Sequence, residues 1–342
     1  MAEEICFFTK DALIIKPPKK SPALLRMIVI VFAMVCGVYI CSTCLKQTNT
    51  ETTRKLLNIE VIERPCHEYD TDRSQIPYSH YPKPKTFSRA ECSCNPVRLF
   101  AVLSAQRSGS GWFETLLNSH INITSNGEIF SVKERRENAS SILRTLDMVY
   151  NLDLITSASK NHCSAAVGFK WMLNQGLIQY HKEIVEYFNN KGVSVIFLFR
   201  RNLLRRMVSV LANSYDRYAR LLNGTHKSHV HSTEEASTLA KYKPEINTTL
   251  LITDLKRMEA STKEALDYFN STRSIILYYE DLIKDHTKLE DVIEFLRLPQ
   301  MNLTSRQVKI HSGPPQEHIK NWDDVNKTLK GTAYESFLRS DY

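Results

Sequence analysis

Four short, mostly apolar runs stand out in the C-terminal three quarters of the chain, at residues 97–104, 165–171, 193–199 and 274–278. Residues 193–199 (VSVIFLF) are almost continuously apolar. This is typical of a central parallel strand that is buried on both faces. The pattern therefore predicts four buried strands.

Segments with apolar residues at helical spacing lie between and after these strands. They cover residues 111–118, 177–189 and 282–296, and one more helix follows residue 199. The apolar face of that helix is formed by Leu203, Leu204, Met207, Val208 and Leu211. Strands that alternate with helices predict an α/β domain with a mostly parallel sheet, flanking helices and right-handed crossovers.

Residues 27–45 form a run of 19 residues without a charge. This length is close to the roughly 20 residues that cross a bilayer, and the run begins too far from Met1 for a cleaved signal peptide. We predict a transmembrane helix at 27–45, a cytosolic tail at 1–26, a Pro- and charge-rich stem at 46–96 and a luminal domain at 97–342.

Asn-x-Ser/Thr sequons support this type II topology, because all seven follow the predicted span and such sites are glycosylated in secreted or luminal regions. They begin at Asn122, Asn138, Asn223, Asn247, Asn270, Asn302 and Asn326. Cys66, Cys92, Cys94 and Cys163 also follow the span. These four cysteines allow three disulfide connectivities, which the sequence leaves open.

Charge and cysteine spacing argue against two classes of partner. The formal net charge of +8 is moderate, and no nucleic-acid-binding motif surrounds the basic residues, so we expect no nucleic acid. Cys92-Ser93-Cys94 is not a zinc spacing and the chain has no CxxC pair. We therefore expect no metal site.

The segment Ser104–Trp112 (SAQRSGSGW) joins the first predicted strand to its helix. Small residues there let backbone N–H groups approach an anion, and the helix N-terminus adds positive potential. The loop departs from the nucleotide-binding pattern GxxxxGK[ST], because Trp112 follows Gly111 where that pattern has lysine. A metal-free phosphorylated ligand therefore fits better than ATP with Mg²⁺.

This loop resembles the 5′-phosphosulfate loop of Golgi membrane sulfotransferases, a family with a P-loop-like α/β fold. The resemblance implies that the co-substrate is 3′-phosphoadenosine 5′-phosphosulfate (PAPS), that the protein lies in the Golgi membrane, and that the loop binds the phosphosulfate. The residues that it assigns to this contact are Arg107, Ser108, Gly109, Ser110, Gly111 and Trp112.

A second element has the spacing of the family's 3′-phosphate site, in which a Ser follows a strand-ending Arg by eight residues. Arg201 and Ser209 match that spacing, and a guanidinium and a hydroxyl suit a phosphate. Residues 275–282 (IILYYEDL) and 319–322 (IKNW) match the family more loosely. The second of these places Lys320 near the nucleotide.

Sulfuryl transfer needs a base for the acceptor proton. Glu128 lies 21 residues after Arg107. Its position resembles that of the Glu downstream of the loop that luminal relatives use as base, and we predict it to be the base. Lys170 ends the second strand at the edge where ligands bind and is predicted to contact the sulfuryl group or the acceptor. Rival bases without such spacing are His162, His181 and His311.

The sequence does not identify the acceptor molecule. A carbohydrate or small molecule is the first hypothesis for the acceptor, and a protein tyrosine is the alternative. Two other functions are also considered for the protein: a catalytically silent glycan-binding or scaffold module, and a degraded NTPase. We expect the acceptor pocket to form from residues 131–162 and 212–265. The basic residues there are Arg217, Arg220, His226, Lys227, His229 and His231.

Overall fold

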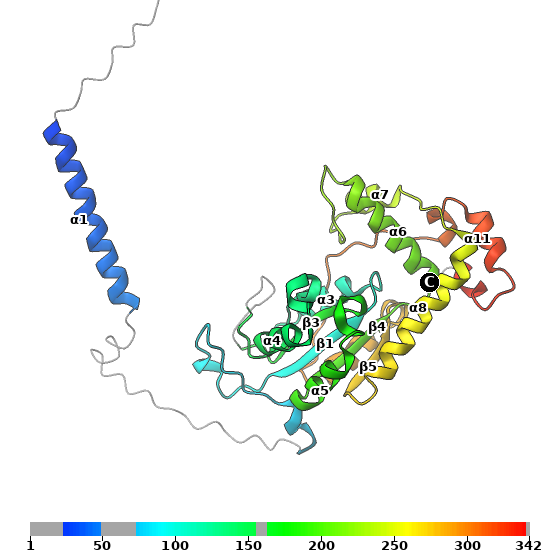
Figure 1. Ribbon diagram of the computed structural model, residues 1–342, viewed down its shortest axis with the longest axis horizontal. Helices are drawn as coiled ribbons and strands as arrows, with labels where there is room; N and C mark the ends of the chain where they lie inside the picture. Colours follow the sequence, from blue (N-terminus) through cyan, green and yellow to red (C-terminus); the bar gives the residue numbers. More distant parts are fainter. Residues whose placement is uncertain (1–22, 49–72, 155–162, 340–342) are drawn as a thin grey trace, which may run out of the picture. The chain divides into compact units, whose positions relative to one another are not determined.

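The computed structural model describes residues 23–48, 73–154 and 163–339 (Figure 1). The folded domain lies in the unit that runs from Cys66 to Tyr342. Its strands are β1 Arg98–Ser104, β2 Ile123–Ser125, β3 Ala166–Met172, β4 Ser194–Phe199 and β5 Ser274–Tyr278. Its helices are α3 Ser110–Ser119, α4 Ala139–Tyr150, α5 His181–Lys191, α6 Leu203–Ala219, α7 Thr233–Ala240, α8 Thr248–Tyr268, α9 Tyr279–Lys284, α10 Thr287–Phe295 and α11 Trp322–Leu329.

All five strands are parallel, in the order β2-β3-β1-β4-β5. The predicted α/β class and four predicted strands are confirmed, and β2 is an addition at the edge. Because β1 pairs with β3 on one side and β4 on the other, the carboxyl end of β1 lies where the winding of the sheet reverses. Ligands bind at such a point in open α/β sheets.

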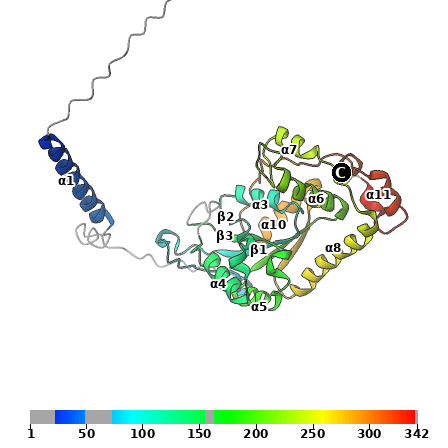
Figure 2. The ribbon, with the colours of Figure 1, turned by 45° about the horizontal axis from the view of Figure 1, so that its top comes forward.

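Side chains of alternate residues on β1 enter different cores. Leu99, Ala101 and Leu103 join the core under α4, α5 and α8, whereas Phe100 and Val102 join the core under α3, α9 and α10. Figure 2 shows α4 and α5 on one side of the sheet and α3 and α10 on the other. Burial on both faces explains why these strands are continuously apolar.

Two predicted helices have different bounds in the structure. The segment 282–296 divides into α9 and α10, because the extended Asp285 interrupts it and its Oδ1 accepts the Thr287 backbone N–H. The helix expected from residue 177 begins only at His181. A turn of π-helix at Leu173–Leu177 precedes it, with Gly176 at a φ of +83°.

The segment that precedes the predicted domain packs on it where the structure describes it. His80 forms an antiparallel bridge with Val97, and the backbone N–H of Lys85 bonds to Asp153 Oδ1 at 2.5 Å. A disulfide joins Cys92 to Cys163, with 5.3 Å between their Cα atoms. These contacts attach residues 80–92 to the start of β1 and to the segment before β3.

The N-terminal helix α1 spans Ala23–Thr48 and includes the apolar run at 27–45. Large hydrophobic side chains along it, such as Phe32 and Val38, are 70% and 71% exposed. Within the described ranges, no helix has the combined length and apolarity that crossing a membrane requires. The transmembrane span therefore remains a prediction that the structure does not support.

Candidate active site

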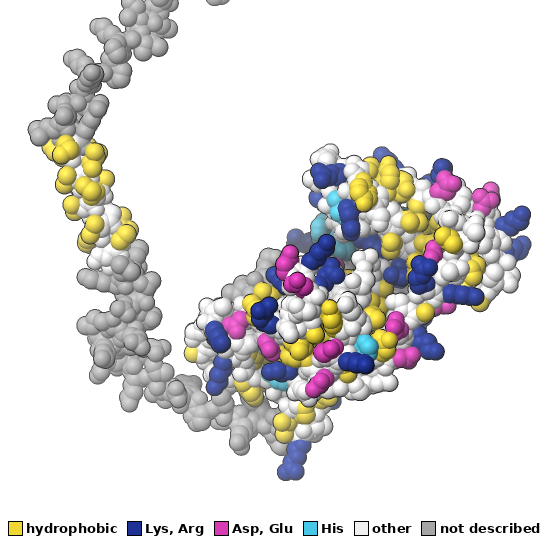
Figure 3. Space-filling view, viewed as in Figure 1, with side chains coloured by type: hydrophobic (Ala, Val, Ile, Leu, Met, Phe, Trp, Pro, Cys, Tyr) yellow, Lys and Arg dark blue, Asp and Glu magenta, His cyan; other side chains and the backbone are white. Residues whose placement is uncertain are grey.

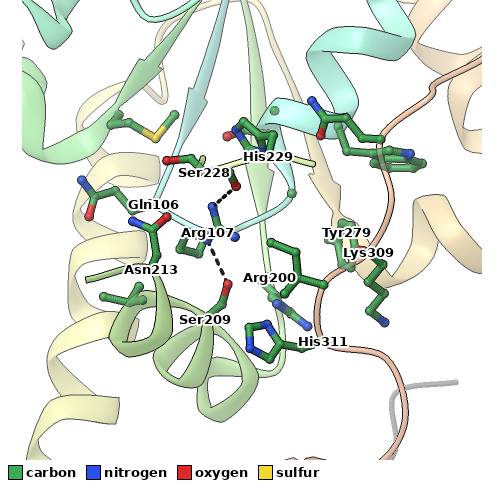
Figure 4. Close-up of a pocket in the computed structure, with 18 of the residues that line it drawn as sticks. Gln106, Arg107, Arg200, Ser209, Asn213, Ser228, His229, Tyr279, Lys309 and His311 are labelled. Atoms are coloured by element: carbon green, nitrogen blue, oxygen red, sulfur yellow. Dashed lines mark hydrogen bonds between the residues drawn. The ribbon is translucent and has the colours of Figure 1, made fainter. Parts of the chain in front are cut away.

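A cavity of about 260 Å³ opens at the carboxyl ends of β1, β3 and β4 (Figure 4). Four of its described lining residues are permanent cations, and a single one is a carboxylate, Glu128. The cations are Arg107, Arg200, Arg217 and Lys309. Figure 3 shows basic and histidine side chains together where the surface is hollowed beside the loop that leads into α7. A cavity of this composition suits a polyanion.

The predicted phosphate loop forms one wall of the cavity. Gly109 has a φ of +85° and precedes α3, and a Cβ atom on it would lie 2.3 Å from the Tyr279 ring. Glycine is therefore required there by both backbone and space. The buried Ser108 hydroxyl has no hydrogen-bond partner among the described atoms. The free N–H groups of the first turn of α3 complete an anion-binding loop.

Arg107 connects this loop to two other parts of the cavity. Its Nε donates to Ser209 Oγ on α6 at 2.9 Å, and its Nη1 donates to the Ser228 carbonyl at 2.7 Å (Figure 4). Burial and the neighbouring Arg200 lower the pKa of Arg107 to about 10, against the attraction of Glu128. The guanidinium therefore stays charged at neutral pH.

The two arginines after β4 point to different places. Arg200 lines the cavity, with its guanidinium 5.3 Å from the centroid of the Tyr279 ring. The Arg201 side chain is 50% exposed, pairs with Asp281 and stacks on Tyr278 outside the cavity. The structure thus brings Ser209 to the cavity but not Arg201, and Arg200 takes the place that the spacing gave to Arg201.

Glu128 lines the cavity and forms an ion pair with Lys170. Lys170 Nζ lies 3.4 Å from Glu128 Oε1 and 3.1 Å from Glu114 Oε2, and its side chain is only 6% exposed. Gln175 Nε2 donates to Glu128 Oε2 at 3.0 Å. Glu128 therefore lies in the cavity as predicted, whereas Lys170 lies behind it.

The segment 307–311 covers the cavity, and His311 is the one residue of it that we predicted, as a rival base. Val308 pairs with Val230 in an antiparallel bridge, which joins this segment to the loop before α7. Lys309 and His311 line the cavity. Burial, His318 and nearby arginines lower the pKa of His311 to about 3, so its imidazole is neutral at pH 7. Lys309 was missed because a single Lys outside any motif is too common in the sequence to single out.

His229 lies against the phosphate loop from the same side. Its ring atoms would be 2.3 Å from a Cβ atom on Gly111, so this position accepts only glycine while the ring is there. Burial of part of the ring, Arg107 and Lys170 lower the pKa of His229 to about 4, although the residue remains partly open to the cavity. A neutral imidazole can accept a proton or a hydrogen bond.

The remaining predicted residues lie elsewhere. Lys320 is 68% exposed and pairs with Glu245 at 2.8 Å, outside the cavity. Of the three rival bases, His311 lines the cavity. His181 stacks on Tyr268 away from the cavity, with 3.6 Å between the ring centroids. His162 lies outside the described residues. In the part of the chain that the structure describes, no cluster of three or more His, Cys, Asp or Glu residues could hold a metal ion.

The expected acceptor region contributes Arg217 and His229 to the cavity. Its other basic residues have partners or lie in solvent. His226 Nδ1 bonds to Asp216, Lys227 pairs with Glu235, and Arg220 ends α6 in the left-handed conformation. The His231 backbone N–H also bonds to Glu235.

No protein-family model matches the chain. Two curated sequences of Nodulation protein H are similar to it. The one from Rhizobium meliloti strain 1021 is 22% identical over 257 residues, and the one from Rhizobium meliloti is 21% identical over 250 residues. Each match covers 71% of this chain and 96% of the relative.

Solved structures are also similar to this chain, and the three described next are sulfotransferases by name. One from Alicyclobacillus acidocaldarius is 14% identical, with 70% of this chain and 98% of that chain covered and a TM-score of 0.36. Mouse SULT7A1 complexed with PAP is 14% identical, with 59% and 60% covered and a TM-score of 0.33. The sulfotransferase domain of the curacin biosynthetic pathway is 17% identical, with 70% and 88% covered and a TM-score of 0.32.

Proposed function

We propose that this protein is a sulfotransferase, which transfers a sulfuryl group from PAPS to a hydroxyl of an acceptor. The observation that carries the proposal is the cavity itself. Its described lining has four permanent cations and one carboxylate, Glu128. A nucleotide with a phosphosulfate and a second phosphate matches the cations, and a hydroxyl acceptor needs the carboxylate.

PAPS supplies an activated sulfuryl group, and the chain's own residues bind it and move the proton. The N–H groups at the start of α3 and the Arg107 guanidinium bind the phosphosulfate and stabilise the charge that develops on the leaving phosphate. Ser209 and Arg200 bind the second phosphate. These roles use the cavity-lining arginine after β4 in place of Arg201.

Glu128 is the general base in this proposal. Its carboxylate accepts the proton of the acceptor hydroxyl while the acceptor oxygen forms a bond to sulfur. The bond between sulfur and the bridging phosphate oxygen breaks, and its electron pair leaves with the bisphosphate. The products are a sulfate ester, adenosine 3′,5′-bisphosphate and one proton, which balance the reactants without a metal or redox partner.

A carbohydrate or small-molecule hydroxyl is the acceptor that we propose. Arg217 comes from the region expected to bind the acceptor, lines the cavity and would pair with an acidic group on the molecule, and the neutral His229 imidazole would form a hydrogen bond with it. Transfer of radiolabelled sulfuryl from PAPS to cell-membrane acceptors tests the reaction, with a Glu128→Gln variant as control. Label that glycosidases release supports the carbohydrate, and label on tyrosine after proteolysis contradicts it. No label above the Glu128→Gln control argues against the whole proposal.

We also propose a type II orientation in the Golgi membrane, with the domain in the lumen. Five of the seven sequon asparagines are exposed, namely Asn138, Asn223, Asn247, Asn270 and Asn302. The disulfide between Cys92 and Cys163 is of a kind that persists in oxidising compartments. Endoglycosidase treatment of the expressed protein should lower its apparent mass, and an unchanged band would contradict a luminal domain.

A further inference from the structure

Lys170 lies between two carboxylates of different exposure. Its Nζ is 3.1 Å from Glu114 Oε2 and 3.4 Å from Glu128 Oε1. The Glu114 side chain is 11% exposed and the Glu128 side chain 35%, and only Glu128 lines the cavity. The ammonium group therefore links a buried carboxylate to the carboxylate that faces the cavity.

Glu114 is held rigidly on the buried side. Its Oε1 accepts hydrogen bonds from Ser125 Oγ at 2.7 Å and from the Gly127 backbone N–H at 2.8 Å. The Lys170 backbone N–H in turn donates to the Gly127 carbonyl at 3.0 Å. One carboxylate of α3 thus orders β2, the turn that leads to Glu128, and the Lys170 ammonium.

A direct role of Lys170 in catalysis conflicts with this geometry. Lys170 is not among the residues that line the cavity, and its side chain is 6% exposed. To reach a sulfuryl oxygen, its ammonium would have to leave Glu114, which would then be a buried carboxylate without its counterion. Leaving a buried carboxylate without its counterion in this way is strongly unfavourable.

We propose that Lys170 is a positioning residue, which Glu114 holds in place and which acts on the reaction only through Glu128. Lys170 and Gln175 bind different oxygens of the Glu128 carboxylate and fix its plane. Each oxygen keeps lone-pair capacity for an acceptor hydroxyl. This inference rests on the proposed function, in which Glu128 takes the acceptor proton.

A double-mutant cycle separates action through Glu128 from direct contact with the substrate. Lys170→Met should lower kcat by roughly 10–100-fold, because a general base contributes about 10²–10⁴-fold and a misoriented one loses part of this. The KM for PAPS should change little. In a Glu128→Gln background, the Lys170→Met change should lower kcat by less than about twofold. Glu114→Gln should lower kcat by a smaller factor and likewise have no effect in the Glu128→Gln background.

Controls for folding accompany the cycle. Lys288→Met, at an exposed lysine that pairs with Asp291, should leave kcat unchanged. Lys170→Arg, which keeps the positive charge, should recover part of the activity. Each variant should keep the thermal stabilisation by adenosine 3′,5′-bisphosphate. If Lys170→Met does not fold, Lys170→Arg and Glu114→Gln carry the same cycle.

The outcomes distinguish this inference from the proposed function. Equal loss from Lys170→Met in the wild-type and Glu128→Gln backgrounds would overturn the positioning role and assign Lys170 to the substrate. A raised KM for PAPS with unchanged kcat would also overturn it. Absence of sulfuryl transfer by the wild-type enzyme would instead overturn the proposed function, before the cycle is measured.

Discussion

Arg107 Nε donates a hydrogen bond to Ser209 Oγ at 2.9 Å, across 102 positions of the sequence. The first residue belongs to the loop after β1 and the second to α6, and both line the cavity. The resemblance assigned them to different phosphates of one co-substrate. Their contact joins the two predicted phosphate-binding elements at one cavity.

Replacing Arg107 should weaken nucleotide binding strongly. Arg107→Ala removes charge-assisted hydrogen bonds to the phosphosulfate, each worth about 1.5–3 kcal/mol. The dissociation constant for adenosine 3′,5′-bisphosphate, measured by calorimetry, should rise roughly 100-fold. Arg257→Ala is the matched control, because Arg257 is 76% exposed and pairs with Asp254 on the surface. An unchanged dissociation constant in Arg107→Ala would remove this loop from the nucleotide site.

Replacing the two adjacent arginines after β4 should change the dissociation constant for the bisphosphate to very different extents. Arg200→Ala removes a cation from the cavity and should raise the dissociation constant for the bisphosphate roughly tenfold or more. Arg201→Ala removes a pair with Asp281 on the surface and should change it by less than about threefold. Calorimetry of both variants tests this. The reverse order would restore Arg201 to the phosphate site.

Gly109 should tolerate alanine poorly. Gly109→Ala places a Cβ atom 2.3 Å from Tyr279 at a φ of +85°, whereas Gly224→Ala has the same backbone strain at +78° and nothing within 4 Å. We expect a loss of roughly 1 kcal/mol in unfolding free energy for Gly224→Ala. Gly109→Ala should lose about 2–3 kcal/mol, with the excess due to the clash. Equal losses in urea denaturation would contradict the close approach of Tyr279.

The stability of the ligand-free domain should fall with acid because of His311. The pKa of His311 is lowered to about 3 in the folded state by burial, His318 and neighbouring arginines. The unfolded chain therefore binds a proton below about pH 6.5 that the folded chain does not, so stability decreases as pH falls from 6.5 toward 3. Between pH 7 and 5.5 this group should cost about 1 kcal/mol.

Urea denaturation at both pH values checks this contribution, with His311→Gln for comparison. The variant should lose about 1 kcal/mol less than the wild type over that range. Equal losses in the two proteins would show that the His311 ring is not held in a cationic surrounding.

The sequence predicted the parts of the fold in which burial alone explains a run of apolar residues. Continuous apolar runs such as 193–199 became β4, because both faces of that strand are buried. β2 was missed because its three residues, Ile123–Ser125, are too few to form a pattern. Helix α8 was missed as well, since its 21 residues bury few side chains and are mostly polar outward.

The site was predictable only as far as backbone spacing determines it. Arg107, Ser209 and Glu128 lie on or directly after elements whose ends meet at one edge of the sheet. Whether Arg200 or Arg201 faces the cavity depends on how the chain leaves β4, which spacing does not show. Lys309 and His311 come from a segment without regular structure, and only tertiary packing against Val230 brings it over the cavity.

The most direct test of the proposed function is thermal unfolding of the purified full-length protein with adenosine 3′,5′-bisphosphate and, separately, with ATP and Mg²⁺. At about 100 times its dissociation constant, a ligand stabilises the folded state by about 2.7 kcal/mol. We predict a raised Tm with the bisphosphate, reduced in Arg107→Ala and Arg200→Ala, and no comparable rise with ATP. No shift with the bisphosphate in a folded sample, or a shift with ATP alone, would contradict a sulfotransferase.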